Sequence, residues 1–260
     1  MAQRAAGYLK YETLANQKSP DIIFGTRAIA EAISAGRDID KVFVQKGLKN
    51  ELFQELRDLG IPINIVPVEK LNRISRANHQ GMIAFISPVS FASLDHVISD
   101  CYQQAKDPFL LMLDGITDVR NFGAIVRTAE GAGVSAIIVP AKGAAQINAD
   151  AMKTSAGALN HVPICRSHNL VETLQYLQGN GIEVIAASEK AEQSFYQLEF
   201  TRPTGLILGS EEKGISPSLI RKADHLARIP MLGKVSSLNV SVSAAIMMYE
   251  VVRQKQMADR

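Results

Sequence analysis

The apolar residues in the second half of the chain fall into short runs separated by helical patterns. One run, residues 109–113 (FLLML), is apolar throughout, which is typical of a central parallel strand buried on both faces. In the segment that follows it, Phe122, Ile125, Val126 and Ala129 recur at helical spacing. Further strands are expected at residues 135–139, 161–165, 181–187, 205–208 and 225–229, and helices at residues 146–157, 169–178 and 238–252. Strands that alternate with helices in this way predict an α/β domain built on a parallel sheet.

A second, smaller alternation of the same kind precedes it. Helices are expected at residues 27–34, 52–59 and 69–74, and strands at residues 41–45, 63–66 and 82–86. In the first of these helices Ile29, Ala32 and Ile33 share one face, and Gly36 ends it. The pattern predicts a small α/β sandwich at the N-terminus.

A proline-bounded segment separates the two patterns. It starts after Pro88 and ends at Pro108, and its residues 94–104 are able to form a connecting helix. We therefore expect four parts: an arm at residues 1–20, a small domain at 21–88, a linker at 89–108 and a larger domain at 109–260.

The composition is that of an ordinary globular protein, with 47% hydrophobic and 21% charged residues among 260. Two cysteines provide no disulfide framework, no apolar run approaches the roughly 18 residues of a membrane span, and no signal-peptide core stands at the start. We expect a cytoplasmic protein without a membrane partner. The expected arm is basic, yet the net charge of +2 neither favours nor excludes nucleic acid, because local basic patches are sufficient for RNA.

Two polar loops follow two of the expected strands. Residues 209–214 (GSEEKG) leave the strand at 205–208, and residues 231–237 leave the strand at 225–229. Loops at the carboxyl ends of neighbouring parallel strands form the ligand crevice of an open α/β sheet. Two ordinary turns before a core helix explain the same pattern.

Other common sites are not supported. Gly131 and Gly133 end a helix rather than start one, so they make no dinucleotide fingerprint, and GSEEKG lacks the Lys-Ser/Thr ending of a P-loop. The histidines have no paired metal-ligand spacing, so no metal is expected.

One loop of the small domain is rich in groups that contact RNA. Arg73, Arg76, Asn78, His79 and Gln80 precede a glycine and offer phosphate contacts and hydrogen bonds to unpaired bases. A solvated loop whose polar residues satisfy its own turn is the alternative. The same choice applies to Lys153 and Ser155, which either reach a substrate or lie on the surface of their helix.

Three stretches resemble a known family. They are LLMLDGITDVRNFGAIVRTAEGAG (residues 110–133), LGSEEKG (residues 208–214) and IPMLGKVSSLNVSVSAA (residues 229–245). Their order and spacing are similar to motifs one to three of the SpoU (TrmH-type) RNA ribose methyltransferases of the SPOUT superfamily. The likeness is close from residue 110 onward and looser in the N-terminal part, which resembles a ribosomal-protein-like (L30e-type) RNA-binding domain.

The resemblance implies methyl transfer from S-adenosylmethionine to a ribose 2′-hydroxyl of RNA. It also implies a deep trefoil knot at the C-terminal end and a homodimer, neither of which composition or periodicity indicates. The apolar helix at residues 238–252 suits a dimer and an ordinary core equally well.

The family motifs assign site residues to positions of this chain. The implied catalytic residues are Asn121, Arg127, Glu211, Ser237 and Asn239. The implied cofactor-binding residues are Leu208, Gly209, Gly214, Ile229, Met231 and Leu238. The expected RNA contacts are Arg27, Arg73, Arg76, Asn78, His79, Gln80 and Arg120.

Helical spacing and elementary chemistry constrain these roles. Asn121 is expected to cap the helix, and Arg127 lies nearly opposite its apolar face, so it points to solvent, a ligand or a second subunit. A guanidinium holds its proton in proteins, so Arg127 suits electrostatic stabilisation of a developing alkoxide and a contact to the adjacent phosphate better than proton abstraction. Glu211 orients Arg127 or accepts the proton through water.

The RNA target is not encoded in the motifs. An L30e-like domain favours a guanosine of large-subunit ribosomal RNA, and transfer RNA is the nearest alternative. A non-catalytic RNA-binding or ribosome-assembly module is a third hypothesis, but such a module would be expected to lack Asn121, Arg127 or Asn239, and all three are present.

Overall fold

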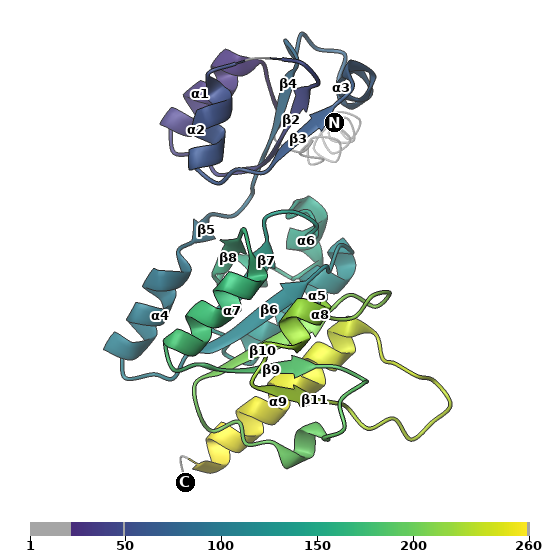
Figure 1. The fold of residues 1–260 in the computed structure, drawn as a ribbon. Coiled ribbons are helices and arrows are strands. Elements are labelled where there is room, and N and C mark those ends of the chain that lie inside the picture. The colour runs from purple at the N-terminus through teal and green to yellow at the C-terminus, as the bar shows by residue number, and fades with distance from the viewer. Residues whose placement is uncertain (1–21, 49, 259–260) are drawn as a thin grey trace, which may run out of the picture. The chain divides into compact units, whose positions relative to one another are not determined.

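The computed structural model describes residues 22–48 and 50–258 (Figure 1). Contacts between residues divide the chain into two compact units, residues 1–88 and 89–260. The arm predicted at residues 1–20 lies outside the described residues. Among the residues described, no helix has the length and apolar character needed to cross a membrane.

The N-terminal unit is a small α/β sandwich, as predicted. Its four-stranded sheet has the order β1-β4-β2-β3, in which only β2 and β3 are parallel. Helices α1 and α2 pack on one face of the sheet, and α3 packs on the other. The strands are β1 (Ile22–Phe24), β2 (Ile39–Gln45), β3 (Ile63–Val66) and β4 (Met82–Ile86), and the helices are α1 (Thr26–Ser34), α2 (Leu52–Asp58) and α3 (Val68–Ile74).

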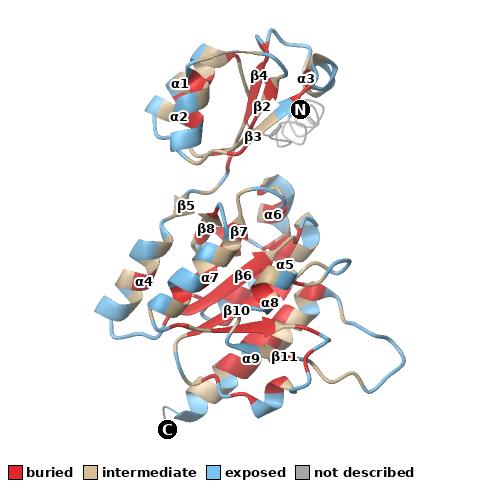
Figure 2. Ribbon diagram, in the orientation of Figure 1, coloured by how far each residue is buried: buried red, intermediate tan, exposed pale blue. Residues whose placement is uncertain are grey.

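The C-terminal unit is a three-layer α/β structure around a seven-stranded, all-parallel sheet of order β11-β9-β10-β6-β7-β8-β5. Figure 2 shows its central strands buried between the helices. The strands are β5 (Phe91–Ala92), β6 (Phe109–Asp114), β7 (Ala136–Pro140), β8 (Ile164–Ser167), β9 (Glu183–Ala187), β10 (Thr204–Gly209) and β11 (His225–Ala227).

Helices cover both faces of this sheet. Helices α5, α6 and α9 bury their apolar residues against one face, and α4, α7 and α8 against the other. They are α4 (Leu94–Gln103), α5 (Val119–Gly131), α6 (Ala149–Thr154), α7 (Leu170–Gly179), α8 (Pro217–Ile220) and α9 (Val240–Ala258). The predicted fold class, a small α/β domain followed by a parallel-sheet domain, is confirmed. The knot stays a prediction.

The order of the strands creates a crevice at the centre of the sheet. From β6 the chain builds outward through β7 and β8, and it then continues on the other side of β6 with β9, β10 and β11. Strands β6 and β10 are therefore neighbours, with Asp114 paired to Gly209 at their carboxyl ends. The loops that leave these two ends diverge, which is where open α/β sheets bind ligands.

The segment predicted to be a linker, residues 89–108, belongs to the C-terminal unit instead. Its residues Phe91 and Ala92 extend the large sheet by pairing with β8, and the buried Ile98 of α4 packs in the core. A two-residue edge strand has too few positions to show an alternating pattern, so the sequence did not reveal it.

Several boundaries of helices also differ from the prediction. The helix expected at residues 238–252 is α9, Val240–Ala258. The helix expected at residues 146–157 is shorter, Ala149–Thr154, because Asn148 caps its start and the backbone turns left-handed after it, with φ values of 51° at Ala156 and 87° at Gly157.

Helix α5 is capped by Asp118, whose carboxylate accepts from the backbone N–H of Asn121 at 2.7 Å. Asn121 is therefore not the cap. This leaves the side chain of Asn121 available for other contacts.

A buried carboxylate anchors the long helix α9. Glu250, which is only 7% exposed, accepts hydrogen bonds from the Arg253 guanidinium at 2.7 and 2.8 Å and from Gln254 at 2.7 Å. Gln254 also binds the backbone of Leu198 and Phe200. The hydrogen bonds from Arg253 hold the pKa of Glu250 below its ordinary value.

We expect the substitution Glu250→Gln to lower the free energy of unfolding by about 1–2 kcal/mol at neutral pH, a modest figure because Arg253 is half exposed. The folded-state pKa lies below the unfolded one, so this stabilisation is complete above the unfolded value of about 4.3 and disappears as pH falls through the folded value. Urea unfolding of both proteins should show a difference that shrinks on acidification. Glu192→Gln, at an exposed position, is the control. A difference independent of pH would contradict the assignment.

Candidate functional site

The loop that leaves β10 folds back tightly against the end of its own strand. The Gly214 N–H donates to the carbonyl of Ser210 at 2.8 Å, and the Lys213 N–H donates to the Ser210 hydroxyl at 3.2 Å. A Cβ atom at Gly209 would lie 2.1 Å from the carbonyl carbon of Gly214, so no side chain fits there. Glycine at position 209 is thus a steric requirement of this turn.

The turn presents Glu211 to two other parts of the chain. One oxygen of its carboxylate, Oε1, accepts from Asn239 Nδ2 at 2.6 Å, from the Val240 N–H at 3.1 Å and from Asn121 Nδ2 at 3.2 Å. Asn239 Nδ2 also donates to Asn121 Oδ1 at 2.9 Å. We refer to Asn121, Glu211 and Asn239 as the amide–carboxylate cluster. It joins the first turns of α5 and α9 to the loop after β10.

The amide of Asn239 is held in one orientation. Its Oδ1 accepts from the Ser241 N–H at 2.9 Å and from the Ser241 hydroxyl at 2.5 Å, so Nδ2 must face Glu211 and Asn121. On the opposite side of the loop, the Ser216 N–H donates to Asp114 Oδ2 at 2.7 Å. The loop after β10 is therefore fixed from both sides.

A cavity of about 390 Å³ lies between the loops that follow β9, β10 and β11. All six residues expected to bind the cofactor line it: Leu208, Gly209, Gly214, Ile229, Met231 and Leu238. Glu211 and Ser237 line it too. Residues 188–190 are additional lining residues that the sequence reasoning missed, although a polar loop after the strand at residues 181–187 was the signal that would have included them.

A second cavity, of about 520 Å³, opens on the other side of the same loop. Its walls come from the loop after β6 and from the first turn of α5, including Asp114, Thr117 and Asn121. Six residues line both cavities: Ser210, Glu211, Glu212, Lys213, Gly214 and Val240. The loop after β10 and the amide–carboxylate cluster thus separate two adjoining spaces.

Arg127 lies away from both cavities of its own chain. It is exposed on α5, as the helical spacing predicted, and it forms no hydrogen bond or ion pair with any described residue. The expected contact between Glu211 and Arg127 is absent within this chain's described residues. Among residues 22–48 and 50–258, no group of three or more His, Cys, Asp or Glu side chains is arranged to hold a metal ion.

In the N-terminal unit, most of the expected RNA contacts are exposed at the start of α1, in the last turn of α3 and in the loop after it. Exposed residues are Arg27, Arg73, Arg76, Asn78 and Gln80. Arg27 donates to Glu31 at 3.0 Å in an ion pair open to solvent, and the side chain of Gln80 lies against Gly25. The β1–α1 connection and the loop before β4 are therefore neighbours.

His79 differs from its expected role. It is buried, and its two ring nitrogens form hydrogen bonds with Asn72 Oδ1 at 2.9 Å and with the Gly81 N–H at 3.0 Å. One nitrogen thus ties the loop to helix α3, and the other is engaged within the loop. His79 therefore shapes the loop and has no ring nitrogen available for RNA.

Comparison with known proteins places these features in a family context. A profile of the SpoU rRNA methylase family matches residues 108–249, and a profile described as RNA 2′-O ribose methyltransferase substrate binding matches residues 22–92. A Staphylococcus saprophyticus protein named as a TrmH family tRNA/rRNA methyltransferase is 35% identical over 238 residues, which cover 90% of this chain and 96% of that protein.

Solved structures agree on the fold. The SpoU methyltransferase AviRb from Streptomyces viridochromogenes, in complex with its cofactor AdoMet, has a TM-score of 0.59 at 23% identity and covers 97% of this chain and 99% of its own. The TrmH/SpoU tRNA modifying enzyme of A. aeolicus has a TM-score of 0.54 at 30% identity over 63% of this chain and 86% of its own.

The amide–carboxylate cluster can be tested through the amide proton of Val240, which has Glu211 as its side-chain partner. In Asn239→Asp a second carboxylate replaces the amide that donates to Glu211, and the two repel. The new carboxylate still accepts from Ser241, so α9 keeps its cap. We expect hydrogen exchange at Val240 to accelerate about tenfold, equivalent to about 1.4 kcal/mol. Asn160→Asp, at an exposed position elsewhere, is the control. Unchanged exchange at Val240 would show that the cluster does not hold this turn.

Proposed function

Because this chain belongs to the SpoU rRNA methylase family, whose members use S-adenosylmethionine, we propose that it methylates a ribose 2′-hydroxyl in RNA. The observation that carries the proposal is the pair of adjoining cavities on the two sides of one loop, with the amide–carboxylate cluster between them. In this assignment, the cavity between the loops that follow β9, β10 and β11 holds the methyl donor. The cavity next to α5 holds the acceptor ribose.

The residues of the first cavity suit the methyl donor. Its volume of about 390 Å³ falls in the range of small-molecule sites. Leu208, Ile229 and Leu238 provide apolar walls for a purine, and the tight turn at Gly209 leaves peptide groups near the ligand. When bound, S-adenosylmethionine supplies a methyl group already activated on a sulfonium sulfur.

The main task of the protein is alignment, because transfer to an oxygen requires that atom to lie in line with the methyl group. A rigid wall shared by both cavities meets this requirement. Glu211 Oε1 has three N–H donors, and Asn121 and Asn239 are fixed by the same hydrogen bonds. Ser237, which lines the donor cavity, completes the set of positioning groups.

The hydroxyl proton must also leave. The second oxygen of Glu211, Oε2, has no hydrogen-bond partner among the described residues, and the side chain is exposed to the acceptor cavity. We assign to Oε2 the acceptance of this proton through a water molecule.

Arg127 is proposed to stabilise the negative charge that develops on the ribose oxygen. Since it lies outside both cavities of its own chain, we propose that it reaches the site of a second copy in a homodimer. The surface beside it suits such contact. The Tyr249 hydroxyl lies 3.4 Å from the Cβ position of Gly131, one helical turn after Arg127, and Val242 and Tyr249 leave 46% and 52% of their area exposed on α9.

The RNA itself is proposed to be large-subunit ribosomal RNA of the cytoplasm, modified at a guanosine, with Arg27, Arg73, Arg76, Asn78, Gln80 and Arg120 as RNA contacts. The match of residues 22–92 to a substrate-binding domain supports RNA recognition by the N-terminal unit. Transfer RNA is the second candidate, because the curated relative is named for both RNA classes.

Tritium transfer from labelled S-adenosylmethionine to unmodified bacterial RNA tests this function. We expect label in large ribosomal RNA, in a nucleotide linkage that resists alkali because the 2′-oxygen is methylated. Label only in transfer RNA would keep the chemistry and overturn the substrate. The absence of both transfer and cofactor binding would overturn the enzyme assignment.

In the same assay, Arg127→Lys is expected to lose at least tenfold in turnover, because lysine lacks the planar guanidinium group of arginine. Near-normal turnover would contradict a need for that group.

Mixing two inactive variants tests the contribution of Arg127 to the second copy. In a mixed dimer of Arg127→Ala and Asn239→Ala, one site receives both intact residues if Arg127 acts across the dimer. With random pairing, half of the dimers are mixed and one of their two sites is intact, so about a quarter of wild-type activity should return. No recovery would place Arg127 in its own chain's site. Asn239→Ala mixed with Glu211→Ala, both from the same site, is the control that should stay inactive.

A further inference from the structure

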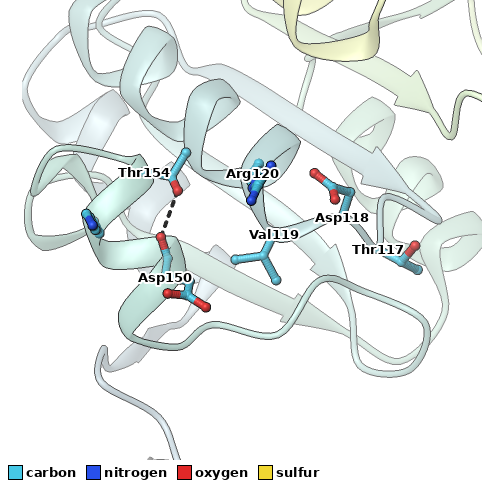
Figure 3. Close-up of a pocket in the computed structure, with 7 residues that line it drawn as sticks. Thr117, Asp118, Val119, Arg120, Asp150 and Thr154 are labelled. Carbon is cyan, nitrogen blue, oxygen red and sulfur yellow. Dashed lines mark hydrogen bonds between the residues drawn. The ribbon is translucent and has the colours of Figure 1, made fainter. Parts of the chain in front are cut away.

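A third hollow, of about 630 Å³, lies between the start of α5 and helix α6. Figure 3 shows the side chains that line it, with Arg120 and Asp118 on the α5 side and Asp150 and Thr154 on α6. Thr117, Val119 and Lys153 complete the lining. None of the expected catalytic or cofactor-binding residues belongs to it.

Both cations of this hollow are free of internal partners. Arg120 and Lys153 are exposed, and neither forms an ion pair or hydrogen bond with any residue among those described. The two carboxylates nearby do not neutralise them. Asp118 directs one oxygen to the Asn121 N–H, and Asp150 has no ion-pair partner in the described chain. The cationic groups are thus available to a ligand.

The hollow adjoins the cavity assigned to the acceptor ribose. Thr117 and Asp118 line both spaces, and Arg120 directly precedes Asn121 of the amide–carboxylate cluster. The two spaces therefore adjoin at Thr117 and Asp118, and an RNA strand bound in the acceptor cavity has this hollow directly beside it.

Close contact of the two helices fixes the width of the hollow. A Cβ atom at Gly123 would lie 2.6 Å from Thr154 Cβ and 3.1 Å from the Ser155 nitrogen, so α5 and α6 approach as closely as a glycine permits. The Thr154 hydroxyl also donates to the Asp150 carbonyl at 2.8 Å (Figure 3). The walls are held in place before any ligand binds.

The chemistry of the lining fits a nucleotide better than a simple anion. Two cations suit a phosphodiester, while two carboxylates and two threonine hydroxyls suit the donors of a ribose 2′-hydroxyl or a base amino group. An inorganic anion would meet as many negative as positive side chains. We propose that this hollow binds the nucleotide next to the methylated one, with Arg120 and Lys153 contacting its phosphate. The proposal rests on the assignment of the second cavity to the acceptor ribose.

Arg120→Ala and Lys153→Ala test the subsite, and Lys106→Ala is the matched control. Lys106 is an exposed lysine just before the amino end of β6, whereas the hollow lies beyond the carboxyl end of that strand. Two quantities are measured with RNA from cells that lack the gene: the salt dependence of equilibrium RNA binding, and KM and kcat for methyl transfer. Each subsite variant should raise KM for RNA about tenfold with kcat within about twofold, and should lower the salt slope by about 1. The Kd for S-adenosylmethionine should not change, which also reports correct folding.

Other outcomes overturn the subsite. Variants that match Lys106→Ala in KM and salt slope would show that no phosphate is bound there. Inorganic phosphate that binds to the wild type but not to Arg120→Ala, while the RNA affinity and salt slope of Arg120→Ala equal those of Lys106→Ala, would show a plain anion site. Because the salt slope needs no turnover, it decides the subsite even if no methyl transfer is found, and a failure of the proposed function is thereby distinguished from a failure of the subsite.

Discussion

One carboxylate oxygen of Glu211 connects segments that are far apart in the chain. Asn121 lies 90 residues before it and Asn239 lies 28 residues after it, yet both donate to Oε1. Without this acceptor, the N–H of Val240 at the start of α9 and two side-chain amides would lose a partner together. This one atom therefore joins the loop after β10, the first turn of α5 and the first turn of α9, and the bond from Asn239 to Asn121 adds a direct link between the two helices.

The sheet makes this meeting possible. Since β6 and β10 are hydrogen-bonded neighbours, with Asp114 beside Gly209, the loops after them leave the sheet side by side. The cavities of about 390 and 520 Å³ lie on the two sides of the loop after β10, and the third hollow lies beside the start of α5. The strand order thus brings together the spaces proposed for the methyl donor, the acceptor ribose and the neighbouring nucleotide.

Much of this arrangement could be predicted from the sequence, because apolar strands followed by polar glycine loops mark the crevice and the three motifs mark its residues. The details that escaped prediction depend on tertiary contacts. Asp118 and Asn121 are both good capping residues. Asp118 is the cap because it is the last residue with extended backbone before the helix starts at Val119. The sequence predicts an exposed polar side chain at His79, whereas contacts with Asn72 and Gly81 in the folded domain bury it. Residues 188–190 carry no glycine or motif, and the polar loop after the strand at residues 181–187 pointed to them only in part. Their place in the cavity depends on the pairing of β9 with β10.

The distance along the chain between the members of the cluster has a consequence for biosynthesis. The Asn121 side chain meets an amide 118 residues further on, so α5 is complete long before its partner has been made. Because translation adds only about 5–20 residues per second, several seconds separate the two ends of this contact. By then the described strands and helices of the N-terminal unit, β1 to β4 and α1 to α3, have all been synthesised. On the roles proposed for the two units, the part of the chain that binds RNA is therefore made before the part that modifies it.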